Sequence, residues 1–230
     1  MVKSHDMKNI WFFGDSFTRG DGCIAENESP YYDNYPNLRD TLWTTKLSNK
    51  FGMNENNLGE SGCSSDWIIN TIVDNLYKIK PNDIVILSDT RPSRYLVPRV
   101  QDNEIHCFSP GQESIWDWHI KNREDTTKPK EWEDMKRTLI DYTWYFQENY
   151  SKLWEEYYLE RFKNLQKYFD SIGVTNYFWS YKLWYEKQID IELISEHIPE
   201  IHNEHFSWKG HEQFSKYIEN ETNVMELVNG

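Results

Sequence analysis

Short apolar runs of strand length alternate in this chain with longer segments whose apolar residues recur at helical spacing. The runs are NIWFF (9–13), DIVILSD (83–89) and VTNYFWSY (174–181). DIVILSD is continuously apolar at its centre, which is typical of a strand covered on both faces. Strands that alternate with helices favour a parallel sheet with helices on both sides. The sequence therefore predicts an α/β fold.

Helical spacing of apolar residues occurs in four segments between and after these runs. The segments are 37–52, 64–79, 131–171 and 207–221. Ser64 or Ser65 can cap the second helix, because a serine hydroxyl accepts a hydrogen bond from a first-turn amide. Gly52 and Gly173 are natural stops for the first and third helices. The spacing over 131–171 fits one long helix or two in series.

The length of the chain favours one domain. Its 230 residues suffice for one sizeable core, and we expect a single domain over 1–230. Residues 92–130 show no clear period and contain four prolines, so we interpret them as a long ordered insertion or a lid-like loop. With the helical pattern that follows, the predicted insertion covers about 92–172 and is largely helical.

Composition and charge argue against several classes of partner. The formal net charge is −13 and no basic run has the density of a nucleic-acid footprint, so we expect no nucleic-acid partner. No stretch approaches the ~18 apolar residues that span a bilayer, and the first apolar run is too short for a signal peptide. Cys23, Cys63 and Cys107 lack CxxC spacing, which favours a reducing compartment. We expect a cytoplasmic protein with no membrane partner, and leave open packaging by another route, such as a virion.

A serine follows the first strand-like run, in WFFGDSFTRGDG (11–22). Taken alone, Ser16 is most simply a turn residue. Its turn, however, and a turn in NLGESGCSS (57–65) are both expected beyond the carboxyl ends of strands, where parallel sheets bind ligands. A serine nucleophile needs a base, usually a histidine, and fixed donors for the oxyanion. His205, just before the last helix, is the best base, and the N–H groups of Ser16 and Gly62 are candidate donors.

The order of these motifs resembles that of the SGNH (GDSL) hydrolase family. Gly14-Asp15-Ser16 comes first, Asn57 to Gly62 follows, and a histidine with a serine and KGHEQF after it comes last. The resemblance implies a flavodoxin-like three-layer α/β/α sandwich and a serine esterase, often acting on acyl or acetyl groups of lipids or sugars. It also implies that Ser16 is the nucleophile and Gly62 an oxyanion donor. The resemblance covers the framework of strands, turns and helices but not residues 95–172.

Two positions depart from the pattern of this family. Its third oxyanion donor is an asparagine in a GxND turn, whereas this turn reads Ser88-Asp89-Thr90-Arg91, so the resemblance gives that role to Thr90. Its orienting acid is an aspartate three residues before the histidine, whereas His202 stands there and Asn203 follows. An asparagine amide oxygen can hold an imidazole, so Asn203 is the candidate orienting residue, with His202 or a backbone carbonyl as alternatives.

Other polar and aromatic residues have candidate roles near the substrate. Asp15 is expected to tie down the turn after the first strand, and it is also a candidate for substrate binding. Arg94 would add positive potential for a substrate, or would pair with one of the many carboxylates. Trp116 and Trp118 lie in the irregular insertion and are candidates for stacking on a sugar ring.

A metal site is the alternative role for three histidines near the C-terminus. His202, His205 and His211 have the spacing H-x2-H-x5-H. There is no HExxH, and no cysteine or carboxylate stands at ligand spacing nearby. We therefore expect no metal and no cofactor, and expect His211 to pack at the start of the last helix.

The leading functional hypothesis is a serine esterase that removes small acyl groups, first of all acetyl, from carbohydrate. A small acyl group on a polar, ring-shaped alcohol suits an acidic protein rich in aromatic residues, and no exposed apolar lid of a lipase is evident. The alternative is a catalytically weak or inactive module of the same fold, used for carbohydrate binding or assembly. The two departures from the family pattern motivate that alternative.

Overall fold

The structure is a computed structural model that describes residues 8–21, 40–90, 94–99, 104–108, 152–180, 206 and 208–221. Its centre is a sheet of four strands: β1 (Asn9–Gly14), β2 (Asn54–Gly59), β3 (Ile84–Ser88) and β6 (Thr175–Trp179). The strand order is β2-β1-β3-β6, and all three pairings are parallel. The predicted α/β fold with a parallel sheet is thereby confirmed, and the place of β1 between β2 and β3 is that of flavodoxin-like sheets.

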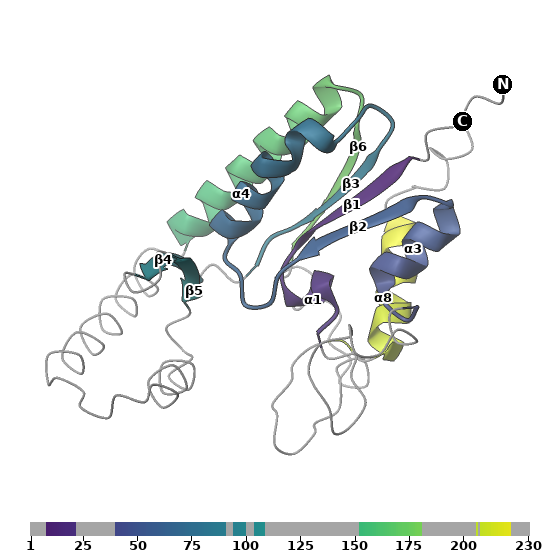
Figure 1. The fold of residues 1–230 in the computed structure, drawn as a ribbon, viewed down its shortest axis with the longest axis horizontal. Coiled ribbons are helices and arrows are strands. Elements are labelled where there is room, and N and C mark those ends of the chain that lie inside the picture. The colour runs from purple at the N-terminus through teal and green to yellow at the C-terminus, as the bar shows by residue number, and fades with distance from the viewer. Residues whose placement is uncertain are drawn as a thin grey trace, which may run out of the picture.

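Helices cover both faces of this sheet (Figure 1). On one face lie α4 (Ser65–Asn75), the short 3-10 helix η2 (Leu76–Lys78) that continues it, and a helix over residues 152–171. On the other face lie α3 (Trp43–Phe51) and α8 (Trp208–Glu221), which contact each other. The molecule therefore has the three layers of an α/β/α sandwich.

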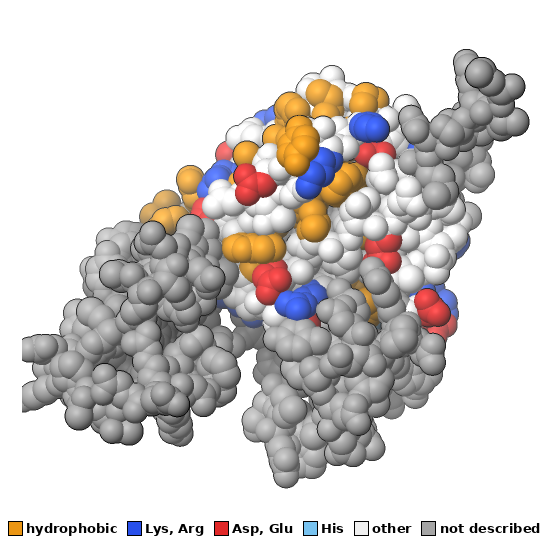
Figure 2. Space-filling view, viewed as in Figure 1, with side chains coloured by type: hydrophobic (Ala, Val, Ile, Leu, Met, Phe, Trp, Pro, Cys, Tyr) orange, Lys and Arg blue, Asp and Glu red, His pale blue; other side chains and the backbone are white. Residues whose placement is uncertain are grey.

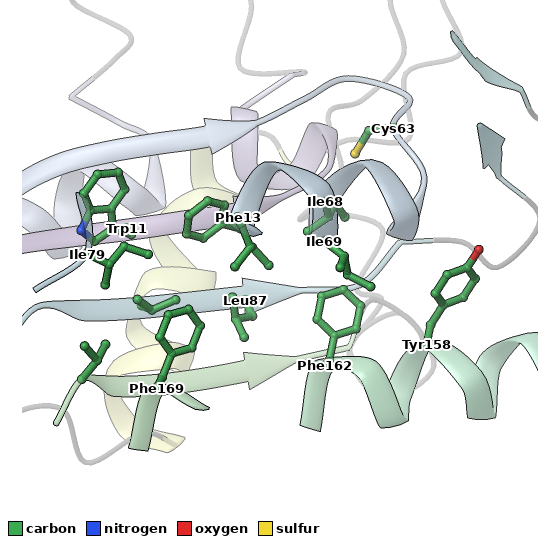
Figure 3. Close-up of a cluster of buried hydrophobic side chains, with 13 residues drawn as sticks. Trp11, Phe13, Cys63, Ile68, Ile69, Ile79, Leu87, Tyr158, Phe162 and Phe169 are labelled. Carbon is green, nitrogen blue, oxygen red and sulfur yellow. The ribbon is translucent and has the colours of Figure 1, made fainter. Parts of the chain in front are cut away.

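Each central strand supplies side chains to both halves of the core, because successive residues of a strand point to opposite faces. In β1, Ile10 and Phe12 pack with α3 and α8, whereas Trp11 and Phe13 pack with α4 and the helix over 152–171. Figure 3 shows the cluster under α4 and the helix over 152–171, in which isoleucines of α4 contact aromatic residues of the other helix. β3 is buried along its whole length, as its apolar run predicted.

The helix ends follow the predicted caps, with one difference at a start. The Ser64 hydroxyl accepts a hydrogen bond from the Trp67 N–H at 3.2 Å and caps α4, and Gly52 ends α3 with a φ of 60°. α3 begins only at Trp43, although the spacing predicted a helix from residue 37. Leu42 is extended and 1% exposed, so an apolar side chain that fitted the helical pattern is buried without being helical.

A short helix and a β-hairpin were not predicted from the sequence. α1 (Ser16–Arg19) is a single helical turn after β1. β4 (Tyr95–Arg99) and β5 (Glu104–Phe108) form an antiparallel hairpin in the segment interpreted as irregular. Pro98 argued against a strand there, but a two-stranded hairpin leaves one edge of each strand unpaired, where a missing N–H is tolerated.

Exposed apolar side chains gather over α4, η2 and the helix over 152–171 (Figure 2). The large ones are Val73, Tyr77, Leu153, Tyr157 and Tyr168. Cationic side chains lie over two of the rings, Lys78 over Tyr77 at 5.3 Å and Arg161 over Tyr157 at 5.5 Å. Among the described helices, none is long and apolar enough to cross a membrane.

Candidate active site

Ser16 lies where β1 gives way to a helix. β1 ends at Gly14, Asp15 is the N-cap, and Ser16 is the first residue of α1. Asp15 Oδ1 accepts a hydrogen bond from the Phe17 N–H at 3.1 Å and so fixes the first turn. This is the carboxyl end of β1, the edge at which parallel sheets bind ligands. Ser16 is 1% exposed, and within the described part of the chain its Oγ has no hydrogen-bond partner.

Close packing around α1 explains why positions 14 and 59 are glycines. A Cβ on Gly14 would lie 2.1 Å from both Ser88 Oγ and Thr18 Oγ1. A Cβ on Gly59, at the end of β2, would lie 2.4 Å from the backbone nitrogen of Arg19. Both distances are far below van der Waals contact, so α1 can lie against β1, β2 and β3 only because these positions have no side chain.

The turn after β2 is bonded to the end of β1. The Glu60 N–H donates to the Gly14 carbonyl at 3.1 Å, and Cys63 Sγ lies 3.5 Å from the same oxygen. Gly62 has a φ of 70°, a backbone conformation that favours glycine, and a Cβ there would meet no atom within 4 Å. The Gly62 turn therefore lies against the end of β1, beside the turn that contains Ser16.

Asp15 is the centre of a buried polar cluster with Thr90 and Arg94. The Thr90 hydroxyl donates to Asp15 Oδ2 at 2.9 Å, and Arg94 Nη1 lies 3.3 Å from the same oxygen. Arg94 Nη1 also donates to Thr90 Oγ1 at 2.7 Å. Of the two alternatives for Arg94, the ion pair with a carboxylate is present in this structure. The single hydroxyl proton of Thr90 goes to Asp15, so donation from this hydroxyl to an oxyanion requires that it turn away.

Asp21 is a buried carboxylate beside the site, and the sequence did not indicate it as a site residue. Its backbone N–H donates to the Ser16 carbonyl at 3.0 Å. Burial raises the pKa of Asp21 to about 6, although a hydrogen bond with Ser61 and the charge of Arg19 lower it in part. Its only sequence signal was a second Gly-Asp pair in GDSFTRGDG, which does not indicate burial.

The last helix brings the chain after residue 205 close to Ser16. The ring of Phe206 packs edge-on against Phe17, the residue after Ser16, with 4.8 Å between the ring centroids. Phe206 also contacts Phe214 and His211. His211 is fully buried near the start of α8, and its Nδ1 lies 3.5 Å from the Trp43 backbone nitrogen.

Several predicted site residues lie outside the described residues. They are His205, Asn203, His202, Trp116 and Trp118. The roles proposed for them stay predictions. In the ranges that the structure describes, no group of three or more His, Cys, Asp or Glu side chains could hold a metal ion.

Comparison with known proteins gives matches among solved structures. A scan against protein-family models finds no match, and a search of curated protein sequences finds none. Among solved structures, a match is described as a candidate lipolytic protein of the G-D-S-L family from Desulfitobacterium hafniense DCB-2. The match covers 93% of this chain and 98% of the other, with a TM-score of 0.36 and 12% sequence identity.

Proposed function

We propose that the protein is a serine ester hydrolase in which Ser16 is the nucleophile and His205 the base. Ser16 is presented by a strand-to-helix turn at the carboxyl edge of the sheet, with no partner for its Oγ among the described residues. The candidate oxyanion donors are the N–H groups of Ser16 and Gly62, with Thr90 as the third. The first N–H groups of a helix have no intrahelical partner, which suits Ser16 N–H to this role.

The contact between Phe206 and Phe17 is the observation that carries the proposal. Phe206 is bonded to His205, and Phe17 is bonded to Ser16. Adjacent Cα atoms in a chain are about 3.8 Å apart, and the two rings pack with 4.8 Å between their centroids, so the chain neighbour of His205 lies beside the residue that follows Ser16. This contact joins residues from opposite ends of the sequence and supports the pair that the motif order suggested.

The proposed reaction has two half-reactions. Ser16 Oγ attacks the ester carbonyl while His205 takes the hydroxyl proton, and the oxyanion is held by the N–H groups of Ser16 and Gly62. The carbonyl re-forms, the bond to the alcohol breaks, and His205 gives its proton to the leaving alcohol. Water then attacks the acyl-enzyme by the same route, which releases the acid and restores Ser16. Asn203 is the proposed orienting residue of His205.

The substrate that we propose is a small acyl ester, first of all an acetyl ester, on carbohydrate. The support is compositional: the chain is acidic and 16% of its residues are aromatic, and tryptophan rings stack on the apolar faces of sugars. Trp116 and Trp118 are the proposed stacking residues, and Arg94 and Asp15 are proposed to lie near the acyl group. We propose that the site lies in a single domain over 1–230 with an insertion at about 92–172.

A comparison of Ser16→Ala with the wild-type protein tests the reaction. We expect wild-type protein to hydrolyse p-nitrophenyl acetate and to react covalently with a fluorophosphonate probe, and expect Ser16→Ala to do neither. Ser48→Ala is a matched control, because Ser48 is also a buried serine but lies in α3, bonded to the Thr44 carbonyl. Equal turnover and labelling in the wild type and Ser16→Ala would contradict the proposal.

A second candidate is a non-catalytic module of the same fold that binds carbohydrate. Two observations favour it: Ser16 is 1% exposed, and the Thr90 hydroxyl proton is donated to Asp15. The same assay separates the candidates. A folded wild-type protein that binds an acetylated oligosaccharide in calorimetry, but shows neither turnover nor labelling, would support the module and exclude the esterase.

A further inference from the structure

Three turns leave the sheet at its carboxyl edge, and one side chain bonds to all of them. Arg94 lies just before β4, and its Nη1 is within hydrogen-bond distance of groups in the turns after β1, β2 and β3, so that its two N–H hydrogens are shared among three acceptors. The acceptors are Asp15 Oδ2 at 3.3 Å, the Cys63 carbonyl at 3.4 Å and Thr90 Oγ1 at 2.7 Å. These turns contain the three candidate oxyanion donors. Asp15 precedes Ser16, Cys63 follows Gly62, and Thr90 is itself the third donor.

The charge of Arg94 is compensated within this cluster. The side chains of Arg94 and Asp15 are 11% and 1% exposed, so the pair is almost fully withdrawn from water. Breaking such a pair by removing one partner leaves the other charge buried and uncompensated. The same Asp15 carboxylate caps α1 through the Phe17 N–H. A change at Arg94 is therefore transmitted to the backbone that presents Ser16.

We propose that Arg94 is a positioning residue that holds these three turns in one arrangement, so that the N–H groups of Ser16 and Gly62 face the same carbonyl oxygen. This inference rests on the proposed esterase function. The chain lacks the asparagine expected in the third turn, and Arg94 bonds to the residue that stands there. The guanidinium thus fixes the donors through their turns, and its proposed place near the acyl group involves no bond to the substrate.

The side-chain chemistry of arginine and lysine predicts a graded series of variants. Arg94→Gln removes the charge that compensates Asp15. Arg94→Lys keeps a positive charge but replaces the planar fork with a single ammonium group on a different stem, so it compensates Asp15 while bonding less well to the other two turns. We expect Arg94→Lys to fall between the wild type and Arg94→Gln in each measurement.

Hydrogen exchange tests the positional claim without reference to activity. In Arg94→Gln we expect faster amide exchange at residues 15–20 and 61–64 than in the wild type, with exchange in β3 unchanged. Lys50→Gln is the control, because it removes the ion pair between Lys50 and Glu219 that joins α3 to α8 away from these turns. Unchanged exchange at both turns in Arg94→Gln, or equal changes in Lys50→Gln, would overturn the inference.

Kinetics test the consequence for the reaction. For p-nitrophenyl acetate we expect Arg94→Gln to lower kcat at least ~10-fold and to change KM less than about threefold, because donors are misplaced while substrate contacts remain. Low millimolar guanidinium should restore part of the activity of Arg94→Ala. Guanidinium lowers the free energy of unfolding by only a few kcal/mol per molar, so at millimolar concentration a variant that was only destabilised would show no change in activity. Absence of rescue would therefore overturn the positioning role.

The two tests separate failure of this inference from failure of the proposed function. A wild-type protein without turnover or labelling excludes the esterase, whereas the exchange data still decide whether Arg94 holds the turns. If the wild type is active and Arg94→Gln keeps its kcat, the positioning role is excluded and the proposed esterase function is not contradicted.

Discussion

Asp21 combines a buried carboxyl group with a position that links two turns of the site. Its N–H donates to the Ser16 carbonyl, and Ser61, in the turn after β2, lowers the pKa of its carboxyl group in part. Burial raises its pKa from the ordinary 3.8 to about 6. Between these two values the folded protein keeps a proton that the unfolded chain releases, and above pH 6 the fold contains a poorly solvated charge.

Asp21→Asn should therefore change the pH dependence of stability. Because the folded pKa is raised, the stabilising effect of protonation is present below pH 3.8 and is lost as the pH rises through about 6. We expect Asp21→Asn to match the wild type near pH 4 and to exceed its free energy of unfolding by up to about 3 kcal/mol at pH 7. Urea unfolding at both pH values measures this. Asp74→Asn, at an exposed site in α4, controls for loss of charge, and an equal gain in that variant would contradict the prediction.

At the residue scale, the sequence predicted the positions of candidate groups better than their contacts. Ser16 could be placed at the carboxyl edge of the sheet because it follows the apolar run of β1, and Gly62 was assigned to the same edge from the order of the motifs. The bonds of Arg94 to Asp15 and Thr90 could not, because they depend on how the turn after β3 folds back over the turn after β1. No local pattern encodes a pair 79 residues apart.

At the scale of elements, the strands with an apolar or aromatic run, β1, β3 and β6, were visible in the sequence, and the polar strand β2 was not. β1 and β3 are the inner strands of the sheet and read as continuous apolar runs. β2 has the sequence NENNLG and stands at the edge of the described sheet with its side chains half buried or exposed, so it has no apolar run and no clear alternation. α1, with four residues, is too short to show helical spacing.

Asp83 joins the amino ends of β1 and β3, at the edge of the sheet opposite Ser16. Its carboxylate accepts hydrogen bonds from the Asn9 N–H at 2.9 Å, from Trp11 Nε1 at 3.0 Å and from the Lys80 N–H at 3.0 Å. It is 3% exposed, so every one of these donors depends on it. An amide in its place would turn one acceptor oxygen into a donor that faces other donors.

Asp83→Asn should accordingly destabilise the fold without altering the site. We expect the free energy of unfolding to fall by about 2–3 kcal/mol, since hydrogen bonds to a charged group are lost in a buried place. Fluorophosphonate labelling of the protein that remains folded should keep its wild-type rate. Asn9→Ala, which removes the longer 3.3 Å side-chain bond to Asp83 and a 3.5 Å bond from Asn54 Nδ2 but leaves the other donors to Asp83 paired, should cost less, about 1 kcal/mol. Equal costs for the two variants would contradict the role of Asp83.

At the scale of the whole molecule, the two halves of the core differ in what they connect. The cluster under α4 and the helix over 152–171 is formed by the middle of the chain together with β1. The cluster under α3 and α8 joins β1 and α1 to the last helix and contains Phe206. Closure of this cluster places Phe206 beside Phe17 of α1. The alternation of strands and helices predicted the layers, but it did not indicate which aromatic residue would close the second cluster.

Phe206→Ala should impair stability and the site together. Phe206 is 3% exposed and packs against Phe17, Phe214 and His211. We expect a loss of about 3–5 kcal/mol in the free energy of unfolding, as for other buried phenylalanines. We also expect slower labelling of Ser16 in the fraction that stays folded, because the chain next to His205 loses its contact with Phe17. Phe206→Leu, which fills most of the space, should recover much of both.

The matched control for this prediction lies in the other half of the core. Phe169 is fully buried against α4 and the sheet (Figure 3), so Phe169→Ala should cost a similar free energy of unfolding. Phe169 belongs to the cluster under α4, whereas Phe17 and the α8 residue Phe214 belong to the cluster under α3 and α8. The labelling rate of folded Phe169→Ala should therefore stay at the wild-type value. If both variants slowed labelling equally at equal folded fraction, the effect of Phe206→Ala would reflect general loosening of the core. The link from the last helix to Ser16 through Phe206 would then be refuted.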